Sequence, residues 1–158
     1  MTRLLLVRHG KTEWNESGRY QGVSDIALNS TGIWQAETIR ERLSGEKIDV
    51  VYCSNLKRAV QTAQIITSGR GLEPIICKEL QEINFGEFEG YTFMEINERY
   101  PDNDWWTAQN AELKLPGGES ISQLAKRVNQ FLERLTPYDK LGTALIVSHG
   151  GTIRALIC

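Results

Sequence analysis

Two of the 158 residues are histidines, and the same local pattern surrounds both of them. His9 comes just after the apolar run 3–7, His149 comes just after the run 143–147, and a glycine follows each histidine. A neutral imidazole can attack phosphorus and form a P–N bond, which divides one difficult displacement into two easier ones. Arg8 stands beside His9, and its charge disfavours the protonated ring. The pattern therefore makes His9 a candidate nucleophile for phosphoryl transfer.

Positive charge for a phosphate is available from two arginines. A guanidinium group binds phosphate oxygens in a bidentate manner, and phosphoryl transfer depends mainly on positioning and charge. Arg8 and Arg58 supply the charge in this hypothesis, and His149 supplies a hydrogen bond. On its own, Arg58 is typical of a solvated helix residue. Gly10 and Gly150 are expected to let backbone N–H groups approach the phosphate.

A leaving alkoxide needs a proton, and Glu82 is the candidate donor. It follows the apolar run 74–77, in a loop that is expected to reach the same end of the sheet. General acid catalysis contributes roughly 10²–10⁴-fold, and the same carboxylate can later activate water. On its own Glu82 is a weak signal, because Glu79, Glu87 and Glu89 are nearby and any of these carboxylates can be a simple surface charge.

Other function classes fit the sequence less well. Two histidines without clustered carboxylates argue against a metal hydrolase, so we expect neither a metal site nor a cofactor. No GxxxxGK[ST] pattern follows any apolar run, which argues against a P-loop enzyme. A binding module that holds phosphate without turnover stays open as the non-enzyme alternative.

Four short apolar runs predict the strands, at 3–7, 49–53, 74–77 and 143–147. Stripes of apolar residues at helical spacing lie between them, within 33–43, 56–66 and 121–135. Such alternation predicts an α/β domain, a three-layer sandwich with a mostly parallel central sheet and helices on both faces. In open sheets of this kind, ligands bind beyond the carboxyl ends of the strands. Both histidines and Arg58 follow such ends.

The stretch from about 85 to 118 departs from this alternation and is predicted to form a lid-like excursion. Thr92 and Glu95 form a capping box for a short helix that Pro101 ends. A polar segment with Trp105 and Trp106 follows, and these two side chains are expected to be packing anchors. Whether they contribute to substrate choice stays open.

Composition predicts one soluble domain over 1–158. The 18 basic residues nearly balance the 20 acidic ones, so we expect no nucleic acid partner. The apolar runs are too short to cross a bilayer, and no signal peptide is apparent, so we expect no membrane partner and a cytoplasmic location. The three cysteines are scattered, which is typical of reduced, buried residues. The partner is then a small-molecule phosphate, and a homodimer is left open.

Several motifs in order resemble those of the histidine phosphatase superfamily, which includes the cofactor-dependent phosphoglycerate mutases. They are LLVRHGKTEWN (5–15), RYQG (19–22) with Asp25, Leu28, Gly32, Gln35 and Ala36, SNLKRAVQTA (54–63) and VSHGG (147–151). The resemblance implies a phosphoglycerate mutase-like fold and hydrolysis without metal or cofactor. It also implies roles for site residues. His9 is phosphorylated, Arg8, Arg58 and His149 complete the phosphate pocket, Glu82 donates the proton, and Asn15, Gln21, Gly22 and Gly150 lie close to the bound group.

Within the superfamily, the sequence is most similar to the small phosphatases. Mutases carry basic and aromatic residues after the acidic glutamate, whereas Ile83 and Asn84 follow Glu82. The runs FGEFEG (85–90) and LPGGES (115–120) are similar to those of the small phosphatases. The resemblance favours the alpha-ribazole phosphatases of cobalamin synthesis, with a broad-specificity phosphatase or a mutase as alternatives. The superfamily usually continues past the second His-Gly with a full helix and a strand, so we expect the natural chain to extend beyond Cys158. Without that extension, the apolar residues 155–158 are expected to form a half-helix with nothing to pack against.

Overall fold

The computed structural model describes residues 3–101, 111–135 and 142–157, and its centre is a parallel sheet of four strands. The strands lie side by side in the order β1-β4-β2-β3. In the register, Val147 of β4 pairs with both Val7 and Cys53, so three strands end at the same level. The strands are β1 (Arg3–Arg8), β2 (Val50–Cys53), β3 (Ile75–Ile76) and β4 (Thr143–Ser148). The four predicted strands are confirmed.

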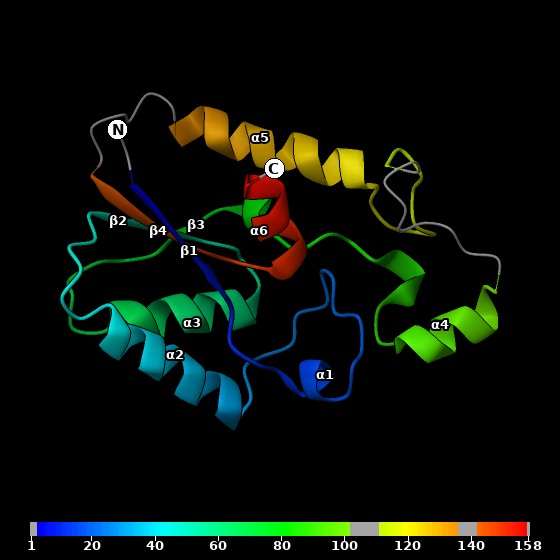
Figure 1. The fold of residues 1–158 in the computed structure, drawn as a ribbon, viewed down its shortest axis with the longest axis horizontal. Coiled ribbons are helices and arrows are strands. Elements are labelled where there is room, and N and C mark those ends of the chain that lie inside the picture. Colours follow the sequence, from blue (N-terminus) through cyan, green and yellow to red (C-terminus); the bar gives the residue numbers. More distant parts are fainter. Residues whose placement is uncertain (1–2, 102–110, 136–141, 158) are drawn as a thin grey trace.

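Helices cover both faces of this sheet, which confirms the predicted three-layer α/β sandwich (Figure 1). One face packs against α2 (Ser30–Arg42) and α3 (Lys57–Thr67), through a core that includes Ala63, Ile66 and Leu145. The other face packs against α5 (Ile121–Leu135) and α6 (Gly150–Ile157), through a core that includes Phe131 and Ile146.

The helix starts follow the predicted caps. Asn29 Oδ1 accepts a hydrogen bond from the Gly32 N–H at 2.9 Å, at the start of α2. Ser120 and Gln123 exchange hydrogen bonds of 3.0 and 3.2 Å ahead of α5, as a capping box requires. The side chains of α5 that are buried are spaced four and three residues apart, at Leu124, Val128 and Phe131.

The excursion after residue 85 begins with η2 (Gly86–Phe88) and α4 (Phe93–Arg99). Thr92 and Glu95 form the predicted capping box of α4. Phe88, Ile96 and Leu115 make a small separate core there. Trp105 and Trp106 lie outside the described residues, and the role of the excursion as a lid stays a prediction. Two further short helices are α1 (Glu13–Glu16) and η1 (Lys78–Leu80), which the sequence patterns did not predict.

Cys53 and Cys77 are buried and unbonded, as predicted. Among the described helices, none is long and apolar enough to cross a membrane. One expectation is wrong. Ala155 and Leu156 of α6 do pack, against a cluster that contains Ile83 and Leu124, because the helix lies over the sheet beside α5.

Candidate active site

His9 lies at the carboxyl end of β1, and its ring is almost completely buried. Its Nδ1 lies 2.7 Å from the carbonyl oxygen of Gly10, which can only accept a hydrogen bond. Nδ1 therefore carries the proton, and Nε2 keeps a free lone pair. Burial lowers the pKa of His9 to about 3, and the charges of Arg58 and Arg8 act in the same direction, against the hydrogen bond with Gly10. The ring is thus a neutral nucleophile near pH 7.

His149, at the carboxyl end of β4, lies against the ring of His9. The two ring centroids are 5.0 Å apart, with 56° between the planes. His149 is fully buried, and among the described residues neither of its ring nitrogens has a hydrogen-bond partner. Burial lowers the pKa of His149 well below its usual value, and the charge of Arg58 adds to this effect. An unpartnered buried polar ring is costly, so this arrangement favours a ligand that accepts its N–H.

Arg58 enters the site from the first turn of α3, which follows β2. Its side chain is buried, and its two terminal nitrogens donate to the carbonyl oxygens of Ser24 at 2.7 Å and Gly22 at 2.6 Å. Its Nε has no hydrogen-bond partner within the described part of the chain. Burial lowers the pKa of Arg58 to about 10, so the guanidinium stays charged near pH 7. The expectation that Arg58 alone is a solvated residue is therefore wrong.

Gly150 brings Arg8 and Glu82 together at the start of α6. A Cβ atom placed on Gly150 would lie 3.9 Å from the Arg8 guanidinium carbon and 4.0 Å from the Glu82 Oε2 atom. His149, the preceding residue, contacts His9. The site thus gathers two histidines, two arginines and one carboxylate from the ends of three strands and one loop, as the sequence predicts.

Glu82 is held by backbone N–H groups. Its carboxylate accepts hydrogen bonds from Ile83 at 3.0 Å, Gly151 at 3.1 Å and Thr152 at 3.2 Å. The last two N–H groups belong to the first turn of α6, where a helix favours negative charge. A side chain at Gly151 would collide with the carboxylate, since its Cβ would lie 2.6 Å from Glu82 Oε1. The glycine after Gly150 therefore has a steric function that the sequence patterns did not reveal.

The loop that carries Glu82 is held by Arg127 of α5. Its guanidinium donates to the carbonyl oxygens of Glu79 at 2.7 Å, Gln81 at 2.9 Å and Glu82 at 3.3 Å. It also forms an ion pair of 2.9 Å with Glu119. Arg127 was not predicted to belong to the site, because a basic residue on an amphipathic helix is typical of a solvated face.

Asn15 and Gln21 are oriented by Thr12, another residue for which the sequence patterns predicted no role. The buried Thr12 hydroxyl lies 2.8 Å from Gln21 Oε1 and 3.2 Å from Asn15 Oδ1. Because these contacts engage the two amide oxygens, the NH₂ groups face away from Thr12. An amide NH₂ group is a suitable donor to a phosphate oxygen.

Gly10 does not have the role that the sequence suggested. Its N–H donates to Thr62 Oγ1 at 3.1 Å, so it is not available to a phosphate. A Cβ atom on Gly10 would collide with the backbone of Gly32 in α2. The glycine lets α2 pack closely behind His9.

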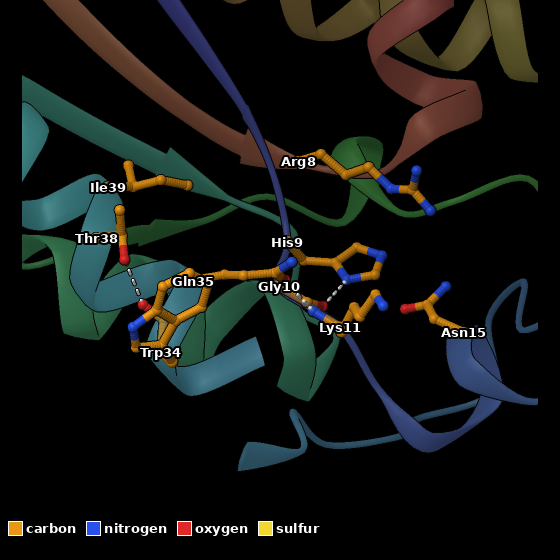
Figure 2. A pocket seen from close by; sticks show the side chains of 9 residues that line it. All are labelled: Arg8, His9, Gly10, Lys11, Asn15, Trp34, Gln35, Thr38 and Ile39. Atoms are coloured by element: carbon orange, nitrogen blue, oxygen red, sulfur yellow. Dashed lines mark hydrogen bonds between the residues drawn. The ribbon is translucent and has the colours of Figure 1, made fainter. Parts of the chain in front are cut away.

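Two cavities lie beside these residues. One, of about 590 Å³, extends from Arg8 and His9 towards Trp34 and Ile39 of α2. Figure 2 shows the side chains of Arg8 and Asn15 on one side of the His9 backbone and those of Trp34, Thr38 and Ile39 on the other. The second, of about 540 Å³, lies beyond Glu82 and is lined mainly by polar side chains: Lys78, Gln81, Asn84, Lys114, Glu119, Gln123 and Arg127.

The family profile described as "Histidine phosphatase superfamily (branch 1)" matches residues 4–158. The chain belongs to this superfamily. Phosphoserine phosphatase 1 of Hydrogenobacter thermophilus is 38% identical, over all of this chain and 75% of its own length. The adenosylcobalamin/alpha-ribazole phosphatase of Escherichia coli is 34% identical, over 98% of this chain and 77% of its own. A solved structure of a putative alpha-ribazole-5'-P phosphatase from Escherichia coli has a TM-score of 0.90 and 33% identity, over 99% of this chain and 77% of that one.

Membership of the histidine phosphatase superfamily confirms the resemblance found in the sequence and the phosphatase class of this enzyme. One similar protein from Arabidopsis thaliana, 39% identical over 99% of this chain and 67% of its own length, is named a metal-independent phosphoserine phosphatase. The substrates in these names differ, so the family leaves the choice of ester to other observations.

Proposed function

We propose that the enzyme hydrolyses a small phosphomonoester in two steps, through a phosphohistidine at His9. His9 Nε2 attacks phosphorus, the P–O bond to the leaving group breaks, and Glu82 gives its proton to the leaving oxygen. Water then attacks the phosphohistidine, Glu82 takes a proton from it, and the P–N bond breaks. Inorganic phosphate leaves, and neutral His9 is restored.

The observation that carries this proposal is the state of the His9 ring. Nδ1 is committed to the Gly10 carbonyl, so Nε2 is the nitrogen available for attack. Buried positive charge beside it, from Arg58, suits the charge of a transferred phosphoryl group. The other residues proposed to contact that group are Arg8, Asn15, Gln21, the backbone at Gly22 and Gly150, and His149.

A trapping experiment tests the nucleophile. The wild-type enzyme, mixed with a ³²P-labelled phosphomonoester and quenched in alkaline denaturant, is expected to carry label that is stable in base and lost in acid. His9→Ala should carry no label and lose turnover. His149→Gln is the matched control, because it keeps His9 and should still become labelled, more slowly. Full activity of His9→Ala would rule out the mechanism.

Alpha-ribazole phosphate, an ester of cobalamin synthesis, is our first candidate substrate. The small-phosphatase segments 85–90 and 115–120 support it. So does the similarity to solved alpha-ribazole phosphatases, with TM-scores of 0.90 and 0.87.

Phosphoserine is a second candidate, favoured by the cavity beyond Glu82. In-line attack by His9 directs the leaving group away from the attacking nitrogen, towards the proton donor. That cavity is polar, and the exposed Lys78 and Lys114 line it. A leaving group with a carboxylate, as serine has, suits such surroundings better than an aromatic base.

A direct comparison of kcat/KM for the two esters decides between them. If the serine carboxylate lies near Lys114, Lys114→Gln should lower kcat/KM for phosphoserine by about 2- to 5-fold, the worth of one exposed ion pair. It should leave the value for alpha-ribazole phosphate unchanged. Lys57→Gln is the control, since Lys57 is exposed and pairs with Asp25 outside this cavity. Similar values for many esters would indicate a broad-specificity phosphatase, and isomerisation of 3-phosphoglycerate faster than phosphate release would indicate a mutase.

A further inference from the structure

The side-chain carboxylate of Glu89 binds backbone N–H groups of the loop at residues 22–24. Its Oε1 accepts hydrogen bonds from the N–H groups of Val23 at 2.9 Å and Phe85 at 3.2 Å. Its Oε2 accepts from the N–H of Ser24 at 2.9 Å, and from the Ser24 hydroxyl. Four donors from two segments thus converge on one carboxylate. The sequence patterns do not distinguish Glu89 from Glu87, since either carboxylate can be a simple surface charge.

Gly22 makes room for this carboxylate. It has φ = +52°, a conformation that side chains disfavour, and a Cβ atom there would collide with Glu89 Oε1. The loop is therefore built around the carboxylate. A residue that served only as a solvated charge would not need this space.

The same loop holds Arg58 with its carbonyl groups. The N–H groups of Val23 and Ser24 bind Glu89, while the carbonyl oxygens of Gly22 and Ser24 bind the two terminal nitrogens of Arg58. A carboxylate on the N–H side and a guanidinium on the carbonyl side align the peptide dipoles of the loop between them. Burial lowers the pKa of Arg58, and the carboxylates of Glu82, Asp25 and Glu89 act in the opposite direction.

We propose that Glu89 is a positioning residue for phosphoryl transfer, which fixes the loop 22–24 so that its carbonyl oxygens hold the Arg58 guanidinium towards the phosphoryl group. The inference rests on the proposed role of Arg58. Glu89 itself touches neither substrate nor the reacting atoms in this scheme.

A double-mutant cycle tests the coupling. Glu89→Gln places an NH₂ group opposite a backbone N–H, so the loop should shift, and kcat/KM should fall by about 10- to 100-fold, as a misplacement of about 1 Å can cause. In an Arg58→Lys background the same change should cost less than about 3-fold, because the guanidinium that Glu89 positions is gone. The inhibition constant of orthovanadate should rise in parallel with the loss of kcat/KM.

Glu87→Gln is the matched control. Glu87 is exposed, lies two residues away and binds the Tyr100 hydroxyl instead of the loop. Its substitution should change kcat/KM by less than 2-fold. If Glu89→Gln fails to fold, Ser24→Ala removes only the hydroxyl contact with Glu89, and its smaller loss should also vanish in the Arg58→Lys background.

The outcomes separate this inference from the proposed function. If Glu89→Gln lowers kcat/KM by the same factor in the wild type and in the Arg58→Lys background, the positioning role is overturned, because a merely structural residue acts independently of Arg58. An unchanged kcat/KM in Glu89→Gln, with a large loss in Arg58→Lys, would overturn the inference alone. An Arg58→Lys enzyme with full activity would instead overturn the proposed role of Arg58, and the inference with it, whereas the phosphohistidine mechanism fails only if His9→Ala keeps full activity.

Discussion

The active site has two sides that are built differently. The phosphate side, defined as His9, Arg58 and His149, is buried, with exposed fractions of 8%, 1% and 0%. The acid side, defined as Glu82 with Arg127, is only partly buried and borders an open polar cavity. On the phosphate side, side chains extend from strand ends and a helix start into the core. On the acid side, backbone N–H groups and one arginine hold a loop.

This difference follows from what each side has to do. Burial keeps the imidazole rings neutral. It also strengthens the electrostatic attraction between the guanidinium and a phosphoryl group, because the local dielectric constant is low. The acid side has to admit a leaving group and then water, so it cannot be closed in the same way. Its carboxylate is fixed by the first turn of α6, and its loop is fixed by Ser148 Oγ, which donates to the Leu80 carbonyl at 2.8 Å. Each side thus obtains rigidity from hydrogen bonds of a different kind.

The largest expected effect falls on the phosphate side. Arg58→Ala removes the buried guanidinium, and kcat/KM should fall by about 10³–10⁵-fold, the range seen for arginines in phosphoryl transfer. The loss should be the same for esters of good and poor leaving groups, because Arg58 binds the group that is transferred. Steady-state kinetics measure this, with Lys57→Ala as the neighbouring exposed control. A loss of kcat/KM below 10-fold in Arg58→Ala would show that the buried guanidinium is not essential on the phosphate side.

A leaving-group series isolates the acid side. Glu82→Gln should lower kcat/KM for an alkyl phosphate by about 10²–10⁴-fold, because an alkoxide needs a proton as it leaves. For 4-nitrophenyl phosphate the loss should be far smaller, since that leaving group departs without one. Equal losses for both esters would contradict the role of Glu82 as the proton donor.

The phosphate side was predictable from sequence for a physical reason. Parallel strands end at one edge of a sheet, so residues that follow apolar runs must meet there, however far apart they are in the chain. His9, Arg58 and His149 all follow such runs. The sheet and its main helices were predictable too, because buried parallel strands and amphipathic helices leave strong patterns of apolar residues.

The supporting contacts could not be predicted in this way. Arg127 and Glu89 are charged residues whose partners are backbone groups of distant loops, and backbone groups leave no pattern in a sequence. Gly10 was predicted to bind phosphate because a glycine lets another group come close to the backbone. Only the structure shows that the group close to Gly10 is the backbone of Gly32. Short elements such as α1 hold too few residues for a periodic pattern.

A substitution at Arg127 tests how much the acid side depends on its loop. Arg127→Gln leaves the carbonyl oxygens of Glu79, Gln81 and Glu82 without their donor, and should lower the free energy of unfolding by about 1–3 kcal/mol. Activity on an alkyl phosphate should fall by about 10-fold as Glu82 loses its position. Lys126→Gln is the control on the same helix, because Lys126 is exposed and stands next to Arg127 in the sequence. Urea unfolding and kinetics measure the two effects, and equal effects of the two variants would refute the role of Arg127.

The smallest effect concerns the proton balance of the phosphate side. Burial holds the pKa of His9 at about 3 and that of His149 well below 6.5. The unfolded chain protonates both rings as the pH falls through about 6.5, whereas the folded chain keeps them neutral. The unfolded state therefore binds more protons, and stability is fully present above pH 6.5 and is lost as the pH falls.

For one such histidine, the loss between pH 7 and pH 5.5 is about 1 kcal/mol. His149→Gln should therefore lose less stability than the wild type over this interval, by about that amount. Urea unfolding at both pH values measures the difference. The contribution of the carboxylates to the pH dependence cancels in this comparison, because both proteins contain the same carboxylates. If wild type and variant lose equal stability, His149 must be able to take up a proton inside the folded site. The phosphate side would then be accessible to protons in the same way as the acid side.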